Sequence, residues 1–329
     1  MKKVVLLTMF LGIGWGGFAQ QPQTTDSPLV HDPVMAKQGD TYYLFATGEG
    51  VSVMSSKDLK TWKFEKPVFA EAPQWAVEAV KGYKGHTWAP DIIYHNGQYH
   101  LFYSCSAFAK NTSVIGHATN PTLDPADPDF KWTDHGKIIQ SVPNRDMWNA
   151  IDPNIIIGED GTPWMSFGSF WDGIKMVKLT DDLMQVAQPE EWYSLCSRPR
   201  SFGLDDKDPG DGAVEAPFIM KHGDYYYLFV SFDYCCRGKD SNYKVVVGRS
   251  KSVVGPYADK EGKPMAKGGG TLVIEGNEAY AGIGHNAAYH LDGKDYFLCH
   301  AYSIAEDGAP KLFIREMTWT ADGWPVVNY

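Results

Sequence analysis

Short apolar runs alternate with turn residues along the chain, and one arrangement of them occurs five times. Each copy has an apolar run, a turn containing Gly and a second run rich in aromatic residues. Such a pair of runs around a turn is typical of a β-hairpin. The five copies read "VHDPVMAKQGDTYYLFAT" from Val30, "WAPDIIYHNGQYHLFYS" from Trp88, "IDPNIIIGEDGTPWMSFGS" from Ile151, "VEAPFIMKHGDYYYLFVS" from Val214 and "GHNAAYHLDGKDYFLCHA" from Gly284.

A second pattern follows each predicted hairpin. It predicts a third strand, a turn and a fourth strand, in "VSVMSSKDLKTWKF", "TSVIGHATNPTLD", "GIKMVKLTDDLMQV", "YKVVVGRSKSVVGPYAD" and "LFIREMTWTADGWPVV". Four antiparallel strands repeated around an axis are the blades of a β-propeller. The sequence therefore predicts an all-β, five-bladed β-propeller as a single domain over residues 20–329. A β-sandwich with coincidental hairpins is the alternative, and five matching registers argue against it.

The N-terminus has the pattern of a secretory signal peptide. Lys2 and Lys3 precede an apolar run that ends in Gly17-Phe18-Ala19, a small-residue cleavage site. We expect residues 1–19 to be removed and the mature protein to reach a periplasm or the exterior of the cell. The apolar run is short for a membrane span, and nothing later resembles one. The mature chain is therefore expected to have no membrane span.

Charge and cysteine content narrow the functional class. Loss of two lysines with the signal peptide takes the formal net charge from −10 to −12. An acidic chain without basic patches is not expected to bind nucleic acid. Five cysteines are too few for a disulfide scaffold and lack the spacing of a zinc site. The adjacent Cys235 and Cys236 could form a disulfide, but we expect two buried thiols. We also expect a monomer.

The propeller brings together residues that are far apart in the sequence. Its innermost strands begin at the axis, so the pairs before Pro33, Pro90, Pro153, Pro217 and Asn286 should meet there. Those pairs are His31-Asp32, Trp88-Ala89, Ile151-Asp152, Glu215-Ala216 and Gly284-His285. Three carboxyls in one narrow cavity repel one another, so one keeps its proton at neutral pH. One protonated and one ionised carboxyl is what glycosidic hydrolysis requires.

A structural explanation exists for the two aspartates alone. Asp-Pro pairs often begin strands, because Asp caps turns and Pro fixes φ. This explains Asp32 and Asp152 separately but not Glu215. Glu215 lies two residues before its proline, whereas each of the two aspartates lies directly before its own proline. Because side chains alternate along a strand, we expect a bulge or a strand shift to bring Glu215 to the same side.

With these motifs the chain resembles glycoside hydrolase family 43. His31-Asp32-Pro33, Ile151-Asp152-Pro153 and Val214-Glu215-Ala216-Pro217 carry the likeness, which covers nearly the whole mature chain. Further segments are similar to the branch that acts on arabinan, the endo-1,5-α-L-arabinanases: "GHTWAPDI", "NAIDPNI", "GSFWDGI", "FDYCCRG" and "GIGHN".

The resemblance implies an inverting mechanism on arabinan or arabino-oligosaccharides. Asp32 would be the general base, Glu215 the general acid, and Asp152 an ionised neighbour that raises the pKa of Glu215. The resemblance also makes His285 a ligand of one central cation, calcium or sodium, completed by water. The alternative for His285 is a structural hydrogen bond.

Sugar binding needs flat apolar faces and a few polar groups on rigid elements. We expect Trp88 and Trp171 to stack on sugar, with Asn149, Ser169 and Phe170 lining the groove. We also expect Phe108, in the loop "SAFAKNTS", to reach the groove. For the aromatic residues the alternative is a place in the core. The acidic stretch 203–212 is expected to be a solvated loop beside the cleft, with calcium binding as the alternative.

Three rival functions remain at this point. One is an exo-acting α-L-arabinofuranosidase or β-xylosidase on the same propeller. A second is the group of retaining sucrose and fructan hydrolases, for which Asn-Asp-Pro and Glu-Cys motifs are expected in place of those found here. The third is a non-catalytic sugar-binding propeller, which would not need three converging carboxyls. The resemblance favours endo-hydrolysis of arabinan.

Overall fold

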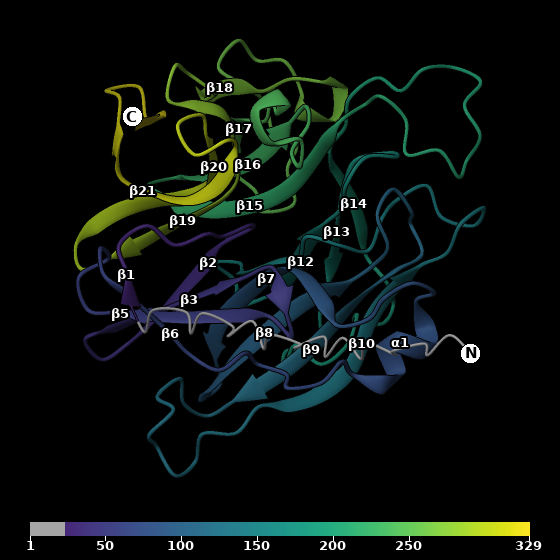
Figure 1. Cartoon of the computed structure of the whole chain (residues 1–329). Helices are drawn as coiled ribbons and strands as arrows, with labels where there is room; N and C mark the ends of the chain where they lie inside the picture. The colour runs from purple at the N-terminus through teal and green to yellow at the C-terminus, as the bar shows by residue number, and fades with distance from the viewer. Residues whose placement is uncertain (1–23) are drawn as a thin grey trace, which may run out of the picture.

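The structure is a computed structural model that describes residues 24–329 (Figure 1). The predicted signal peptide, residues 1–19, lies outside the described residues. The described chain forms five antiparallel sheets in sequence order. The prediction of an all-β, five-bladed propeller is confirmed. No helix in residues 24–329 has the length and apolar character needed to cross a membrane.

Each blade is one sheet whose strands follow one another along the chain. Blade 1 has β2 (Val34–Gln38), β3 (Thr41–Ala46), β5 (Ser52–Ser56) and β6 (Trp62–Phe64), edged by β1 (Thr24–Thr25). Blade 2 has β7 (His86–His95), β8 (Gln98–Cys105), β9 (Ser113–Asn120) and β10 (Thr133–Ser141), with β4 (Gly48–Glu49) beside β7. Blade 3 has β11 (Asn154–Ile157), β12 (Pro163–Phe167), β13 (Ile174–Lys178) and β14 (Trp192–Cys196).

The last two blades follow the same order. Blade 4 has β15 (Val214–His222), β16 (Tyr225–Phe232), β17 (Lys244–Ser250) and β18 (Thr271–Ile274). Blade 5 has β19 (Tyr280–Leu291), β20 (Lys294–Ser303), β21 (Ala309–Trp319) and β22 (Pro325–Val327). The short helices α1 (Gln74–Ala79), η1 (Gly238–Asp240) and η2 (Met265–Lys267) lie in connections.

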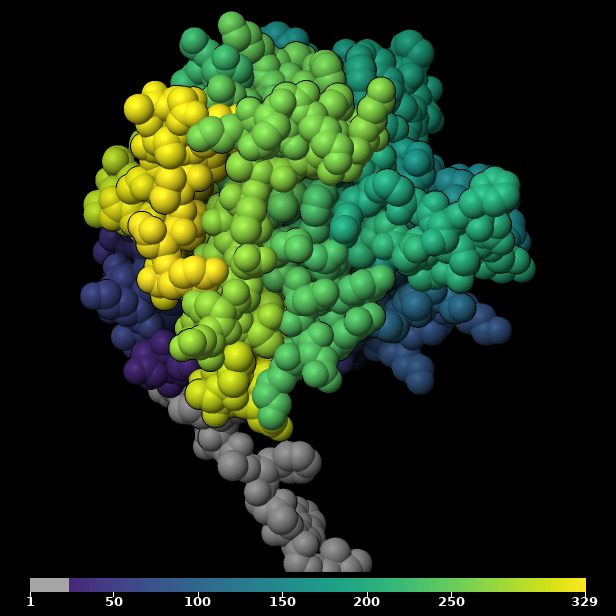
Figure 2. Space-filling model, turned by 90° about the horizontal axis from the view of Figure 1, so that it is seen from above, coloured from purple at the N-terminus to yellow at the C-terminus, as the bar shows by residue number. Residues whose placement is uncertain are grey.

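The first strands of the blades form a closed ring. Contacts run from β2 to β7, β7 to β11, β11 to β15, β15 to β19, and from β19 back to β2. The closure joins the two ends of the chain, because Val30 donates to the Pro310 carbonyl and Leu312 donates to the Pro28 carbonyl. Figures 1 and 2 show the purple N-terminal blade beside the yellow C-terminal blade. This ring is what brings the five strand starts to one axis.

The fourth strands were predicted correctly in only two blades. In blades 1 and 5 they lie within the predicted segments, as β6 and β22. In blades 2, 3 and 4 the outer strand comes later, as β10, β14 and β18. In blade 3, for example, the segment after β13 closes a turn in which Leu183 donates to the Thr180 carbonyl. Local turns satisfy their own backbone groups, so the sheet is completed by a segment further along the chain.

The aromatic second strands fill the space between blades. Phe45, Tyr103, Phe229 and Phe297 are at most 1% exposed. Burial of side chains this large is worth about 1.5–3 kcal/mol each. The rigid strands that result hold the residues at their ends in place.

The expectation of two buried thiols at Cys235 and Cys236 is wrong. The two residues form a disulfide, with Cys235 partly exposed and Cys236 exposed. They lie in a surface connection between β16 and β17, which the aromatic run before them did not indicate. Cys105, Cys196 and Cys299 are free and buried.

Candidate active site

Five equivalent residues turn the chain at the start of the innermost strands. All have a left-handed backbone, with φ between 38° and 58°. Side chains seldom allow this conformation, so its repetition marks a position that the fold imposes. We call them the corner residues: Asp32, Ala89, Asp152, Ala216 and His285.

Each corner residue donates its backbone N–H to a side chain of the preceding blade. Asp32 donates to His300 Nδ1 at 3.1 Å, and Ala89 to Thr47 Oγ1 at 2.8 Å. Asp152 and His285 donate to Ser104 and Ser231. Ala216 donates to Oδ2 of Asp152 at 3.1 Å. Buried backbone donors need such partners, so these bonds fix the corners relative to one another.

The expected bulge is present at Glu215. The corner residue of blade 4 is Ala216, and the pairing of β15 with β16 shifts between Glu215 and Phe218. Before the shift Glu215 pairs with Ser231 and also bridges to Ser169 in blade 3. The bulge therefore changes the direction of the side chains at the start of the strand, as bulges next to active sites commonly do.

The Asp32 carboxyl lies among imidazoles. Its Oδ1 is 2.9 Å from His285 Nδ1 and 3.5 Å from His300 Nδ1, and its Oδ2 accepts a hydrogen bond from Thr47. Burial alone would raise the pKa of Asp32, but His285, with His300 and His31, holds it well below its ordinary value. Asp32 is therefore ionised at neutral pH, as a general base must be.

Asp152 and Glu215 are the carboxyls that hold protons. Burial raises the pKa of Asp152 to about 8, against the opposing effect of His285, and the Glu215 charge adds to the rise. Burial also raises the pKa of Glu215, against the hydrogen bonds that it accepts. The structure differs here from the expectation of an ionised Asp152, because Asp152 is only 5% exposed. At neutral pH the two carboxyls together retain a proton.

Two hydroxyls hold the Glu215 side chain. Ser169 donates to Oε2 and Tyr243 donates to Oε1, each at 2.7 Å. Tyr243 is fully buried and reaches Glu215 because blade 5 has Gly284 at this level. A Cβ on Gly284 would lie 2.0 Å from the Tyr243 ring. Gly284 in blade 5 thus leaves room for Tyr243, which orients the carboxyl of Glu215 in blade 4.

Within residues 24–329, none of the three carboxyls forms an ion pair with Lys or Arg. The ion-pair partners of Asp32 are His31, His285 and His300, and Asp152 and Glu215 have none. One ionised and one protonated carboxyl around a shared imidazole can remove a proton from water and deliver another to a leaving group. This is the chemistry of acid–base hydrolysis.

His285 and its neighbour Asn286 have free ligand atoms. Burial favours a neutral His285, yet Asp32 and the other two carboxyls raise its pKa to about 9. The contact of its Nδ1 with Asp32 leaves Nε2 for another partner. The Asn286 side chain is 2% exposed, and its amide oxygen and nitrogen have no hydrogen-bond partner in the described residues.

The predicted sugar-binding residues lie in different environments. Ser169 contacts Glu215 directly. Asn149 is 4% exposed, and its Oδ1 lacks a partner among residues 24–329. Trp88 is half-buried beside the corner residue Ala89, and its indole N–H donates to His86. Phe170 packs 5.9 Å from the ring of Tyr234, and Phe108 is 77% exposed in the loop after β8.

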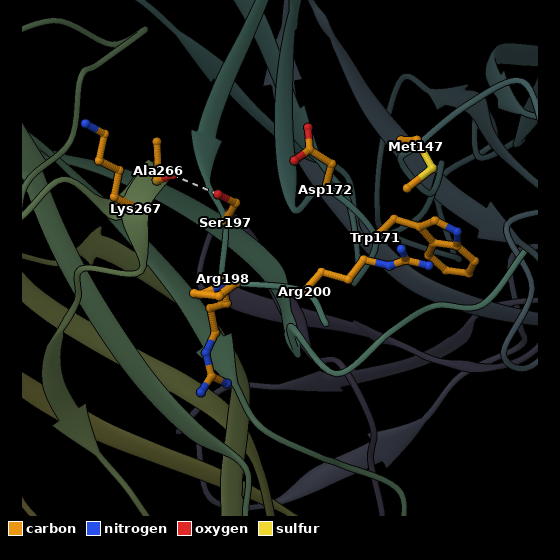
Figure 3. A pocket seen from close by; sticks show the side chains of 9 residues that line it. Met147, Trp171, Asp172, Ser197, Arg198, Arg200, Ala266 and Lys267 are labelled. Carbon is orange, nitrogen blue, oxygen red and sulfur yellow. Dashed lines mark hydrogen bonds between the residues drawn. The ribbon is translucent and has the colours of Figure 1, made fainter. Parts of the chain in front are cut away.

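Trp171 does not have the open face that stacking on a sugar requires. It is 3% exposed, and its indole N–H donates to the Asp206 carbonyl. Figure 3 shows it with Met147 at one side of a pocket of about 640 Å³, opposite Ala266 and Lys267. The pocket lies between blades 3 and 4, and none of the three carboxyls lines it. Trp171 instead supports the acidic loop 203–212.

The comparisons with known proteins agree with this geometry. Residues 27–325 match the model of Glycosyl hydrolases family 43. The chain belongs to this family. It is therefore a glycoside hydrolase, and the family 43 resemblance inferred from the motifs is confirmed.

Two curated relatives and one solved structure illustrate the likeness of this family 43 chain. It is 53% identical to an extracellular exo-α-(1→5)-L-arabinofuranosidase, ArbA, of Cellvibrio japonicus, over 91% of this chain and 86% of the relative. It is 40% identical to an extracellular endo-α-(1→5)-L-arabinanase of Bacillus subtilis, over 90% and 87%. The structure of Cellvibrio cellulosa α-L-arabinanase complexed with arabinohexaose is 51% identical, with a TM-score of 0.90 and coverage of 92% and 96%.

Sequence reasoning placed Ser169 in the groove but missed the other hydroxyls that support the site, although the repeats contain their signal. Each hairpin copy ends in "FAT", "FYS", "FGS", "FVS" or "CHA", so four of five copies have a hydroxyl at the same place. These hydroxyls belong to Thr47, Ser104, Ser169 and Ser231, and all four bond a corner amide or a site carboxyl. Tyr243 has no counterpart in the repeats that would have singled it out.

Proposed function

We propose that the protein hydrolyses internal α-1,5 linkages of arabinan with inversion at the anomeric carbon. The observation that supports this most is the meeting of Asp32, Asp152 and Glu215 around one axis, without Lys or Arg partners among residues 24–329. Relatives named as α-1,5-arabinan hydrolases, at 53% and 40% identity, support the choice of substrate. Their names describe them as extracellular, which agrees with export by the proposed signal peptide.

In this mechanism Asp32 accepts a proton from a water molecule as the water oxygen attacks the anomeric carbon. Glu215 donates its proton to the oxygen of the leaving sugar, and the glycosidic bond breaks. Asp32 then carries the proton from water and Glu215 is ionised, so exchange with solvent restores both. Inversion requires room for the water, which corresponds to carboxyls about 6.5–9.5 Å apart.

Asp152 has two functions in this proposal. Its Oδ2 accepts the Ala216 N–H, so it fixes the backbone beside Glu215. Its proximity also raises the pKa of the pair, so that a proton is available near neutral pH. The proton is delivered through Glu215, because Ser169 and Tyr243 hold that side chain in position.

A calcium or sodium ion held by His285 is the cofactor that we propose. The donors fit such an ion: the Nδ1 contact with a carboxylate leaves Nε2 free, as is usual for a metal-bound histidine. The unpartnered amide oxygen of Asn286 is the kind of ligand that a hard cation prefers. A bound cation would supply positive charge beside the three carboxyls and adjust their protonation.

The decisive test is product analysis on linear 1,5-arabinan, with xylan and fructan as comparison substrates. We expect early products to be a mixture of arabino-oligosaccharides, and NMR to show that the new anomeric centre is inverted. Hydrolysis of xylan or fructan but not arabinan would contradict the proposed substrate. A retained anomeric configuration would contradict the proposed mechanism.

An exo-acting α-L-arabinofuranosidase is the second candidate. The 53% identity to a relative named as exo-acting favours it. The same experiment separates the two, because release of monosaccharide alone from the first minutes would contradict endo action. Oligosaccharides of several lengths would contradict strict exo action.

A further inference from the structure

The Cys235–Cys236 disulfide stands in a segment that adjoins both sides of the catalytic centre. We call residues 233–242, which join β16 to β17, the rim segment. The backbone N–H of Cys236 donates to the Tyr302 hydroxyl at 2.7 Å. The Tyr302 ring lies 5.5 Å from His31 and 5.2 Å from His300, the histidines around Asp32. On the other side Tyr234 packs against Phe170, the residue after Ser169.

The rim segment is held firmly in this position. Asp233 bonds Arg198 at 2.6 Å and Lys244 at 2.9 Å. Tyr234 and Asn242 are joined by two hydrogen bonds, from the Tyr234 N–H to the Asn242 side chain and from the Asn242 N–H to the Tyr234 carbonyl. Because the segment is fixed at both ends, the disulfide is presented to solvent on a rigid support.

Global stability does not explain this disulfide. A cross-link stabilises a fold mainly by closing a loop in the unfolded chain, and the effect grows with loop length. Cys235 and Cys236 are adjacent, so their bond encloses no intervening residue. What it creates is a compact apolar surface of two sulfur atoms that cannot change shape. Cys236 is exposed and Cys235 partly exposed, so the disulfide stands at the protein surface.

We propose that the Cys235–Cys236 disulfide is a substrate contact, an apolar platform for the face of a furanose ring bound beside the scissile linkage. This inference rests on the proposed function, because it assigns the surface to the same sugar chain. Sugar sites combine a few polar groups with rigid apolar faces. The three carboxyls and their imidazoles supply the polar part, and the disulfide supplies an apolar face at its edge.

The test compares Cys235→Ser/Cys236→Ser with the wild type on arabinohexaose, with kcat and KM measured separately. We expect KM to rise roughly tenfold, the low end of what loss of one apolar pocket contact produces. The pH profile should keep its shape, because neither cysteine touches the carboxyls. An unchanged KM would overturn the proposal, and so would a loss confined to kcat.

A reductant gives a second measurement on the unchanged sequence. A phosphine opens the disulfide to two thiols while it takes up the oxygen of a water molecule. We expect reduction to raise the KM of the wild type, and reoxidation to restore it. The free cysteines are buried, and burial raises the pKa of Cys105 and Cys196 to about 12, so they react little. The double variant is the control and should not respond.

Binding separates failure of this inference from failure of the proposed function. In a Glu215→Gln background, calorimetry with arabinohexaose should show weaker binding when both cysteines are also serine. A wild type that hydrolyses arabinohexaose together with equal binding by the two Glu215→Gln proteins overturns only the platform. A wild type that neither binds nor hydrolyses arabinohexaose overturns the proposed function and the platform with it.

Discussion

At the scale of single residues, the site consists of acids that differ in what surrounds them. Asp32 is surrounded by imidazoles and is ionised, whereas the buried Asp152 and the partly buried Glu215 together retain a proton. Three similar side chains thus acquire different protonation states from their neighbours alone, which is how one site provides both an acid and a base.

The pH dependence of activity should follow from these states. Because the pKa of Asp32 is held low, its protonation should not limit kcat/KM until the medium is strongly acidic. Because the pKa of the Asp152–Glu215 pair is raised, the alkaline limb should come from loss of that proton. Tyr243→Phe removes a hydrogen bond that lowers the pKa of Glu215. We expect it to move the alkaline limb of the kcat/KM profile to higher pH.

A matched variant strengthens this measurement. Tyr289→Phe removes another buried hydroxyl, one that accepts a hydrogen bond from the Met35 N–H away from Glu215. Its alkaline limb should stay where it is in the wild type. If Tyr243→Phe shifted the limb to lower pH, the assignment of that limb to Glu215 would be wrong.

Removal of the acid itself has a larger expected effect. Glu215→Gln keeps the shape of the side chain but cannot supply a proton, so turnover of arabinan should fall by about 10²–10⁴. Affinity for arabinohexaose should remain close to that of the wild type. Calorimetry and initial rates measure the two quantities, and unchanged turnover would show that Glu215 is not the general acid.

At the scale of elements, the second strands support the first strands. The hydroxyls of Thr47, Ser104 and Ser231 each accept a hydrogen bond from the backbone N–H of the next blade's corner residue. A left-handed corner leaves this amide without a partner in its own sheet. A hydroxyl on the second strand of the neighbouring blade accepts this hydrogen bond. The bond fixes the position of the corner residue and therefore of its side chain.

Ser104→Ala should show how much one of these hydrogen bonds contributes to the free energy of unfolding. It leaves the Asp152 amide without its partner in a buried place, which costs about 1–3 kcal/mol of unfolding free energy. Ser166→Ala is the control, because Ser166 is equally buried but makes only a 3.5 Å contact with the Asn154 carbonyl. Urea unfolding measures both, and equal losses would contradict a special role for the corner amide.

Blade 2 contains a stack of histidines that should make stability depend on acid. The rings of His100, His117 and His135 lie 5.1 and 5.2 Å apart in succession. Burial lowers the pKa of His117 to about 3, and the other two rings add to the effect. Between pH 6.5 and 3 the unfolded chain therefore binds a proton that the folded chain does not, so stability falls as pH falls.

The contribution of His117 can be isolated by substitution. The wild type should lose on the order of a few kcal/mol more unfolding free energy than His117→Gln when the pH is taken from 7 to 4. Urea unfolding at the two pH values gives the difference for each protein. The same loss in both proteins would show that other groups cause the acid sensitivity.

At the scale of the whole molecule, the closed ring is the condition for the site. Residues from blades 1, 3, 4 and 5 contribute its charged groups, and no single blade contains both the proposed base, Asp32, and the proposed acid, Glu215. The ring also brings the negative charge of the three carboxyls to the axis, and this charge raises the pKa of His285 to about 9 against the effect of burial.

Removal of a bound cation should therefore affect activity more than structure. Chelation with EDTA is expected to lower kcat/KM, and added calcium to restore it, while the far-UV circular dichroism stays unchanged. We expect the fold to persist without the proposed ion, because the five sheets are complete by their own hydrogen bonds. Full activity after exhaustive chelation would exclude a functional calcium ion.

The sequence by itself determined the number of blades, their hairpins and the identity of the three carboxyls. The blades and hairpins are a local pattern repeated five times, and three of the five copies have a carboxyl just before the proline. Repetition makes such a short pattern recognisable. The outer strands of blades 2, 3 and 4 were misplaced, because a turn and a strand of similar residues differ only in what they pair with.

Only the tertiary structure decided what surrounds each residue. The bulge at Glu215, the role of Tyr243, the burial of Trp171 and the charge of Asp152 all depend on segments far away in the chain. Gly284 shows the reason: it is an unremarkable residue in its own strand, yet the space that it leaves admits the ring that positions Glu215. Local propensity sets the elements, whereas burial and protonation arise when different blades meet.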